Sequence, residues 1–387
     1  MSEPITEKEN QHYVPQFYLK YFSLNDKSVG MYRFAEDKII PYASIKNNFN
    51  ISFFYGEDGK MEDAFADLEG KWNSIIKQIL ETQKLPDGDE EQLFIRLLFL
   101  LQSARTKYKC DEWDAYTTKL YSEILSSKDH DLYSKIKGKF KIRSQCPAMP
   151  YIQAAFDLLP QTYDLTIGLI INDSNLEFIT SDNPVIFCNH LFESKKLKRG
   201  FGFLNIGIQF FLPISSKVML CMYDSNVYDL ITPKAKHTSK IKKINSMIVN
   251  NSGEAIVFKY DAKSEQFNDY IIRASRKKAC FTNQVNAPED MIVFTNRQLK
   301  GNYDLSDFFS IKQQYRNMKI HAPTPEEIQY YADLKLHKHM IELQKQGNLD
   351  DALKNDDLAC ISVSIRDPAI LRPWAQRLLN EQENDSI

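Results

Sequence analysis

The chain has 387 residues, of which 43% are hydrophobic and 26% are charged, a composition typical of a soluble globular protein with a large core. This length favours one large domain with an appendage, or two domains. The formal net charge of −2 argues against a protein that binds polyanions over its whole surface, but it leaves room for a local basic patch.

The spacing of the cysteines and the length of the apolar stretches indicate the cellular compartment. The six cysteines are scattered, and no two form a C-x-x-C pair, which disfavours both a cysteine metal site and a disulfide framework. Residues 1–10 have no apolar core like that of a secretory leader, and the longest apolar stretch, 93–101, is too short to span a bilayer and contains Arg96. These features predict a cytoplasmic protein with reduced thiols and no membrane contact.

The N-terminal segment 11–22, QHYVPQFYLKYF, is the densest run of unusual residue types, with one histidine, one proline and five aromatics. Two short strands are expected after it, over 29–34 and 38–43, the second interrupted by Pro41. Glycine and aspartate at 56–59 then predict a turn.

The strongest helical pattern covers residues 61–82, where apolar residues recur at three- and four-residue steps. Glu62 and Glu69 are seven residues apart in it, so they share a stripe beside the apolar face.

A second helix is expected over 89–108, in which Gln102 and Arg105 are three residues apart and project to one side. Residues 112–165 are also expected to be mostly helical, with a break around 145–150, QCPAMP.

Short segments rich in β-branched and aromatic residues follow and predict a sheet. These segments are 166–171, 176–180, 184–188, 205–214 and 218–223.

The C-terminal part begins with a strong helix start, in which Thr324 caps the helix, Pro325 opens it and Glu327 completes a capping box. The expected fold is therefore α+β, with an N-terminal helical layer packed on a mainly antiparallel sheet and a helical C-terminal extension. The expected division is a domain over 1–322, helical over about 61–165 and sheet over about 166–300, followed by the extension over 323–387.

Five motifs occur in an order that carries a family resemblance. They are HYVPQ at 12–16, FYG with its two-glutamate helix at 54–69, LQSARTK at 101–107, FITSDNPVIF at 178–187 and FFLPISSKVML at 210–220. The chain resembles domain-of-unknown-function family 4238 over roughly residues 10–285, in separated islands. The resemblance brings no settled activity. It implies a bacterial protein, and genomic neighbourhoods of some members suggest phage defence.

These islands carry polar residues at positions where an apolar residue would pack as well, and we expect them to converge in one cleft between the first two helices and the sheet. The set is His12, Glu62, Glu69, Gln102, Arg105, Ser181, Asp182 and Asn183.

Each group has a chemical use in such a cleft. His12 would be a general acid or base, because its ordinary pKa lies near neutrality. Arg105 would hold an anionic group in a bidentate grip. Glu62, Glu69 and Asp182 would coordinate a divalent ion such as Mg²⁺ or Mn²⁺, or orient other groups.

Structural alternatives stand beside these roles. His12 is read equally well as a hydrogen-bonded structural group, and Glu62 as a carboxylate favoured by the helix dipole. Glu69 and Arg105 form an inter-helix ion pair in the plainer interpretation. Residues 181–184, Ser-Asp-Asn-Pro, make a good turn by local chemistry alone.

Two classes of function remain open. The first is a hydrolase, a nuclease or phosphodiesterase acting on nucleic acid or nucleotide as a defence effector or toxin. The second is a non-catalytic sensor or adaptor that binds a protein partner or a small ligand through the aromatic N-terminal segment and the C-terminal helices. The near-neutral net charge counts against a general nucleic-acid binder.

Overall fold

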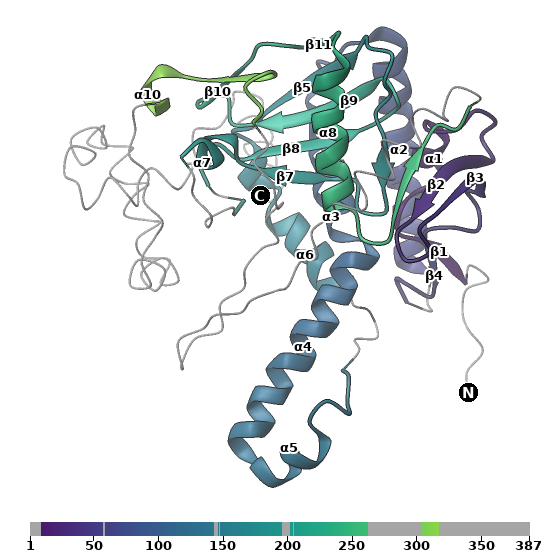
Figure 1. Ribbon diagram of the computed structural model, residues 1–387, viewed down its shortest axis with the longest axis vertical. Helices are drawn as coiled ribbons and strands as arrows, with labels where there is room; N and C mark the ends of the chain where they lie inside the picture. The colour runs from purple at the N-terminus through teal and green to yellow at the C-terminus, as the bar shows by residue number, and fades with distance from the viewer. Residues whose placement is uncertain are drawn as a thin grey trace, which may run out of the picture.

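A five-stranded sheet lies at the centre of the fold, with helices on both of its faces (Figure 1). The computed structural model describes residues 9–56, 59–142, 146, 148–195, 202–203, 205–261 and 304–316. Within them, helices pack on mainly antiparallel sheets, which confirms the expected α+β class.

The central sheet has the strand order β11-β5-β9-β8-β7, and every pairing in it is antiparallel except that of β11 with β5. Its strands are β5 (Thr166–Asn172), β7 (Ile186–Cys188), β8 (Gln209–Pro213), β9 (Val218–Tyr223) and β11 (Lys234–Ala235). Because successive side chains point to opposite faces, Phe210 and Leu212 enter one hydrophobic cluster while Phe211 enters the other. Both faces are buried, which explains why these strands are continuously apolar.

A second sheet has the order β3-β2-β12-β6, from β2 (Ser28–Arg33), β3 (Lys38–Ser44), β6 (Thr180–Ser181) and β12 (Ala255–Phe258). The register shifts between Val29 and Met31, so the strand that contains Pro41 bulges opposite Gly30. Proline is tolerated here because β3 is an edge strand. A Cβ on Gly30 would lie 2.5 Å from the Phe258 ring, so only glycine fits this crossing.

Two small sheets complete the strand pairing. In the first, β1 (Asn10–His12) pairs with β4 (Asn50–Ser52), which places the start of the N-terminal segment beside the loop at 45–49. In the second, β10 (Tyr228–Leu230) pairs with β13 (Phe309–Ile311).

The helices divide between the two faces of the central sheet. On one side lie α1 (Gln16–Lys20), α2 (Lys60–Thr82), α3 (Asp89–Ala104) and α6 (Met149–Asp157), and on the other α7 (His190–Ser194) and α8 (Thr238–Asn251). The remaining helices are α4 (Lys107–Lys128), α5 (His130–Ile136), the 3-10 helix η1 (Pro160–Thr162) and α10 (Gln313–Arg316).

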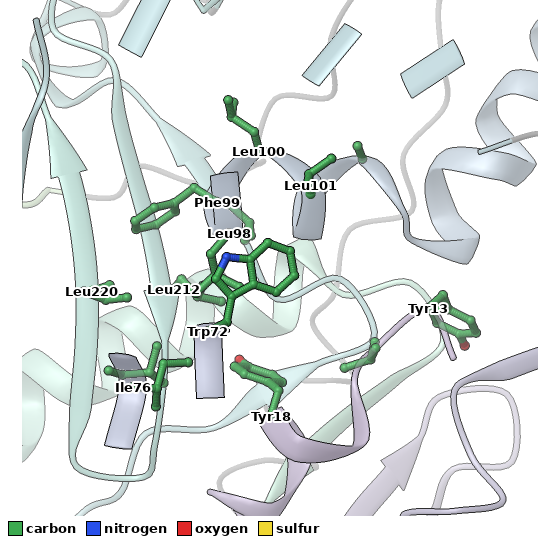
Figure 2. Packing of buried hydrophobic residues seen from close by; sticks show 14 of the residues in the cluster. Tyr13, Tyr18, Trp72, Ile76, Leu98, Phe99, Leu100, Leu101, Leu212 and Leu220 are labelled. Carbon is green, nitrogen blue, oxygen red and sulfur yellow. The ribbon is translucent and has the colours of Figure 1, made fainter. Parts of the chain in front are cut away.

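Trp72 of α2 anchors the first cluster, and Figure 2 shows its indole between the helices and the strands that carry Leu212 and Leu220. Its ring nitrogen Nε1 donates to the carbonyl oxygen of Phe94 at 2.9 Å, so its polar atom is satisfied inside the core. Burying so large a side chain relative to leaving it exposed stabilises the fold by about 2–3 kcal/mol.

Most of the expected elements within the described residues are present, with two differences. The helix expected over 89–108 ends at Ala104, because Arg105 leaves the helical conformation and Thr106 caps the next helix by accepting from the Lys109 N–H at 3.3 Å. The strand expected over 176–180 is reduced to β6. The Asn172 side-chain amide donates to the Leu176 carbonyl at 2.7 Å and closes a turn there. The expected helical extension at 323–387 lies outside the described residues.

Within the described part of the chain, no helix is long and apolar enough to cross a membrane.

Candidate functional site

Arg105 is the centre of a buried polar cluster between α2 and α3. Its side chain is fully buried, and its Nη1 lies 2.8 Å from Oε1 of Glu69. Nε and Nη2 donate to Oε1 of Gln102 at 3.3 and 3.2 Å. The guanidinium also lies over the Phe65 and Trp72 rings, 4.5 and 5.6 Å from their centroids. Its charge and its hydrogen-bonding groups are therefore used inside the protein.

Gln102 and Tyr55 connect this cluster to the N-terminal segment. The Gln102 amide donates to the Tyr13 carbonyl at 3.1 Å, and the Tyr55 hydroxyl donates to the His12 carbonyl at 3.1 Å. Gln11, fully buried, accepts from the Tyr55 N–H at 2.5 Å. Four separate pieces of the chain, the N-terminal segment, the turn at 53–56, α2 and α3, are thus held together by side-chain amides and one guanidinium.

The His12 ring sits at the edge of this cluster and is half-buried. Its Nε2 lies 3.1 Å from the Lys46 carbonyl oxygen, which can only accept, so Nε2 carries the proton and Nδ1 keeps a lone pair. The Gln16 amide approaches Nδ1 at 3.5 Å. Burial lowers the pKa of His12, against the opposing effects of the Lys46 carbonyl and the negative charge of Glu69. The imidazole is therefore neutral at pH 7.

Glu62 and Glu69 lie on the stripe of α2 that the sequence predicts, and the charges of both act on the Tyr55 hydroxyl. Glu62 is in the first turn of the helix, where the helix dipole stabilises a negatively charged carboxylate. Glu69 keeps a quarter of its side chain exposed while it pairs with Arg105. His12, Glu69, Gln102 and Arg105 are therefore brought together, with Glu62 beside them.

Asp182 lies in a different group, on the second sheet. Its carboxylate accepts from the N–H groups of Gly253 and Glu254 at 2.8 and 2.5 Å, and only 3% of the residue is exposed. The Ser181 hydroxyl accepts from the Asn183 N–H at 3.1 Å, as the local turn chemistry predicts. Asp182 therefore fastens the turn at 181–183 to the start of β12.

Asn183 forms a reciprocal pair with Asn251 at the end of α8. The Asn183 amide donates to the Asn251 carbonyl at 3.0 Å, and the Asn251 amide donates to the carbonyls of Asn183 and Val185 at 2.7 and 2.8 Å. The Asn183 side-chain oxygen Oδ1 has no donor among the described residues. This amide pair joins the end of α8 to the turn at 181–183, and the Asn183 Oδ1 acceptor is not used in it.

The structure thus divides the predicted residues between two groups instead of one cleft. One surrounds Arg105, and the other surrounds Asp182. Tyr13 is linked to the Arg105 group through its carbonyl, which accepts from Gln102, and burial raises the pKa of its hydroxyl, with a further upward contribution from the charge of Asp182. Among the described residues, no group of three or more histidine, cysteine, aspartate or glutamate side chains is placed to hold a metal ion.

A pocket of about 270 Å³ opens beside the Asn183–Asn251 pair, between α3, α4, α6 and β7. Leu100 and Ala104 line it from α3, and Tyr151 and Ala154 line it from α6. Its wall on the sheet side is Phe187. Most of the lining is apolar or aromatic, which is typical of a site for a small organic molecule.

Polar groups stand at two places in this pocket. One is the Asn183–Asn251 pair, in which Asn183 Oδ1 has no donor among the described residues, and the other is Lys109 of α4, near Ser103 and Tyr108 on the same lining. That ammonium pairs with Glu112 at 2.7 Å and lies 5.3 Å from the centre of the Tyr151 ring. The Glu112 carboxylate neutralises it, so the pocket favours an uncharged ligand over an anion.

The sequence did not reveal this pocket. Among the residues singled out in advance, only Asn183 lines it, and that residue was assigned to a catalytic set. The other walls are ordinary alanine, leucine and aromatic residues at helical spacing, which are indistinguishable in sequence from residues that fill a core. The break at 145–150, which leads into α6, was the nearest visible signal.

A family model described as "Protein of unknown function (DUF4238)" matches residues 10–262, more than half of the chain. Comparisons with curated proteins and with solved structures find no match.

Proposed function

The chain belongs to the DUF4238 family of proteins of unknown function, and from that premise we propose that it is a non-catalytic binding protein of the sensor type. Its ligand is a small, uncharged molecule with an aromatic or aliphatic ring, bound in the pocket between α3, α4 and α6. The observation that carries the proposal is an apolar pocket of about 270 Å³ next to a side-chain acceptor, Asn183 Oδ1, that no described donor occupies.

The polar cluster around Arg105 supports this choice over catalysis. A guanidinium that clamps a substrate needs donors that point into open space, whereas Arg105 is fully buried against Glu69 and Gln102. Opening the cluster to a substrate would break a buried ion pair, at a cost of about 3–5 kcal/mol.

The ligand chemistry follows from the pocket walls. Tyr151 and Phe187 offer ring faces and edges for an aromatic body. Asn183 Oδ1 selects a ligand with an N–H or O–H donor, and Lys109 can donate to a neutral acceptor while it keeps its bond to Glu112.

The test uses N-phenyl-1-naphthylamine, a neutral aromatic amine that becomes fluorescent in apolar surroundings. We expect the folded protein to bind it at one site and to gain about 2.7 kcal/mol of stability at a probe concentration of 100 times Kd. Ala154→Phe, which fills the pocket, abolishes both effects. The control is Gln153→Phe, which adds the same ring on the exposed side of α6 and leaves binding unchanged. Equal binding by both variants would contradict the proposal.

One observation favours a second candidate, a hydrolase acting on phosphodiester bonds. Nδ1 of His12 keeps a lone pair on a neutral ring beside the partly exposed Glu69, which is the state that a general base needs near neutral pH. Arg105 acts here as a positioning residue through Glu69 and Gln102.

This second candidate is tested with purified protein, single-stranded RNA and DNA, and added Mg²⁺ or Mn²⁺. The expected result is strand cleavage that His12→Ala removes while the thermal unfolding midpoint stays within a few degrees. Growth arrest or phage protection in cells then follows the same variant. No cleavage by the wild-type protein with either metal, or cleavage that His12→Ala leaves intact, rules out this role for His12.

A further inference from the structure

A helical arm extends from the body of the molecule. Figure 1 shows α4 leaving the end of α3 and running away from the sheets to the short helix α5. In α4 the buried residues Cys110 and Asp114 both lie in the first half, and α5 has no buried residue. The chain returns along α4, held where Thr118 Oγ1 bonds both the N–H and the carbonyl of Ile142 at 2.9 and 3.2 Å. The end of the arm is therefore built without a core of its own.

Residues 128–142, the arm tip, concentrate positive charge. They contain five lysines against two aspartates, a net charge of +3 in a chain whose total is −2. All five lysines are exposed, and none of them forms an ion pair within the described part of the chain. These lysines are Lys128, Lys135, Lys137, Lys139 and Lys141.

Several lysines elsewhere in the described chain are paired with acidic residues or backbone oxygens. At the base of the arm, Lys107 pairs with Asp111 and Glu254. On α8, Lys240 donates to the Asp307 carbonyl and Lys243 pairs with the Asp307 carboxylate. Exposed lysines without an ion pair also occur singly elsewhere in the described residues, so what distinguishes the tip is the concentration of five of them within fifteen residues.

Aromatic and apolar side chains alternate with these lysines. Tyr133 and Phe140 are each half-buried at the tip, and Lys137 Nζ lies 5.7 Å from the centre of the Tyr133 ring. Leu132 is 45% exposed beside them. Rings that stay partly open next to unpaired ammonium groups are the combination by which proteins bind single-stranded nucleic acid, because bases stack on the rings while lysines contact phosphates.

We propose that the arm tip binds single-stranded RNA or DNA without sequence preference. The chain as a whole carries a net charge of only −2, so attraction for a polyanion must come from a local surface, and the tip concentrates a net charge of +3. An anionic membrane is the less favoured partner: Asp129 and Asp131 share the tip with the lysines, and α5 is too short to bury an apolar face in a bilayer surface. This proposal is independent of the pocket, although α4 connects the two sites.

The first experiment measures fluorescence anisotropy of labelled 20-residue oligo-U and oligo-dT with the full chain. We expect a Kd of about 10⁻⁴–10⁻⁶ M at a physiological salt concentration of about 150 mM, as for other non-specific complexes, and tighter binding at about 50 mM. The logarithm of the binding constant falls against the logarithm of salt concentration with a slope of about −3, since each phosphate contact contributes about −0.7.

Two fourfold variants with the same loss of charge separate the arm tip from the rest of the surface. The tip variant is Lys135→Ala, Lys137→Ala, Lys139→Ala and Lys141→Ala, and the control variant is Lys38→Ala, Lys84→Ala, Lys234→Ala and Lys236→Ala, all exposed. We expect the tip variant to bind about tenfold or more weakly with a flattened salt slope. The control stays within about twofold, and both keep the wild-type unfolding midpoint and N-phenyl-1-naphthylamine binding.

A third variant, Phe140→Leu, keeps an apolar side chain but removes the ring. It weakens the single-stranded complex several-fold and leaves binding to duplex DNA unchanged, because paired bases are not free to stack. The proposal is overturned if neither oligonucleotide binds at about 50 mM salt, if the two fourfold variants lose equal affinity, or if only phosphatidylglycerol vesicles bind. Retained binding of N-phenyl-1-naphthylamine in those cases leaves the proposed function standing.

Discussion

The Arg105 cluster and the Asn183–Asn251 pair are both built from polar residues that the motif pattern singles out, yet they end in different states. Around Arg105, the cation is fully enclosed between Glu69, Gln102 and two aromatic rings. Around Asn183, the amides satisfy backbone carbonyls and one acceptor remains beside an open pocket. The difference shows that dense polar motifs mark places where distant segments of the chain are joined. A binding site additionally needs an open pocket next to the polar residues.

The sharpest way to break this comparison is Arg105→Ala. We expect a loss of about 3–5 kcal/mol in the free energy of unfolding, because Gln102 loses its donors and Glu69 its buried partner. Urea denaturation measures the loss. The control is Lys71→Ala, which removes an exposed pair with Glu90 at 3.5 Å and costs less than about 1 kcal/mol. If Arg105→Ala lowers the free energy of unfolding no more than the control does, the cluster is not structural. That result would favour a catalytic role for Arg105.

The other half of the comparison is tested by Asn251→Ala, which leaves the buried carbonyls of Asn183 and Val185 without their donor. The expected loss of stability is about 2–3 kcal/mol, smaller than for Arg105 because no charge is stranded. Asn73→Ala removes an exposed hydrogen bond to Tyr21 and serves as the matched asparagine control, with a change below about 1 kcal/mol. Weaker binding of N-phenyl-1-naphthylamine by Asn251→Ala alone would tie the amide pair to the pocket.

The smallest effect concerns His12. Burial lowers its pKa, so the unfolded chain binds the proton more tightly than the folded one. The neutral, buried His12 therefore contributes fully to the free energy of unfolding above the unfolded pKa of about 6.5. This contribution is lost as the pH falls below that value, because the unfolded chain takes up the proton first. In thermal unfolding between pH 5 and 8, the unfolding midpoint of His12→Gln should fall less steeply toward acid pH than that of the wild-type protein. Part of the slope remains, because burial also lowers the pKa of His190. An unchanged slope would mean that the environment of His12 is not maintained in solution.

Much of the fold could be read from the sequence because its signals are local. The apolar period of 61–82 predicted α2 to within one residue at its start, and the short apolar runs predicted β5 and β9. The end of α3 could not be read, because the apolar pattern continues through Arg105, whereas in the structure Arg105 leaves the helical conformation and Thr106 caps α4. Tertiary contacts overrode local propensity there.

The candidate site was predictable only in its parts. Seven-residue spacing placed Glu62 and Glu69 on one stripe of α2, and local turn chemistry explained Ser181 and Asn183. That Asp182 would bond Gly253 and Glu254, some seventy residues away, depended on how β6 and β12 pair. No local pattern contains that pairing.

The sequence by itself determined the class of the fold, the family, and the main helices and strands. Periodicity and turn chemistry are properties of neighbouring residues, and they survive without knowledge of the rest of the chain. Tertiary structure alone decided that Arg105 is enclosed, that Asp182 lies apart from it, and that α3, α4 and α6 leave a pocket between them. Burial, satisfied hydrogen bonds and empty space depend on packing between segments distant in sequence, so they exist only once the chain has folded.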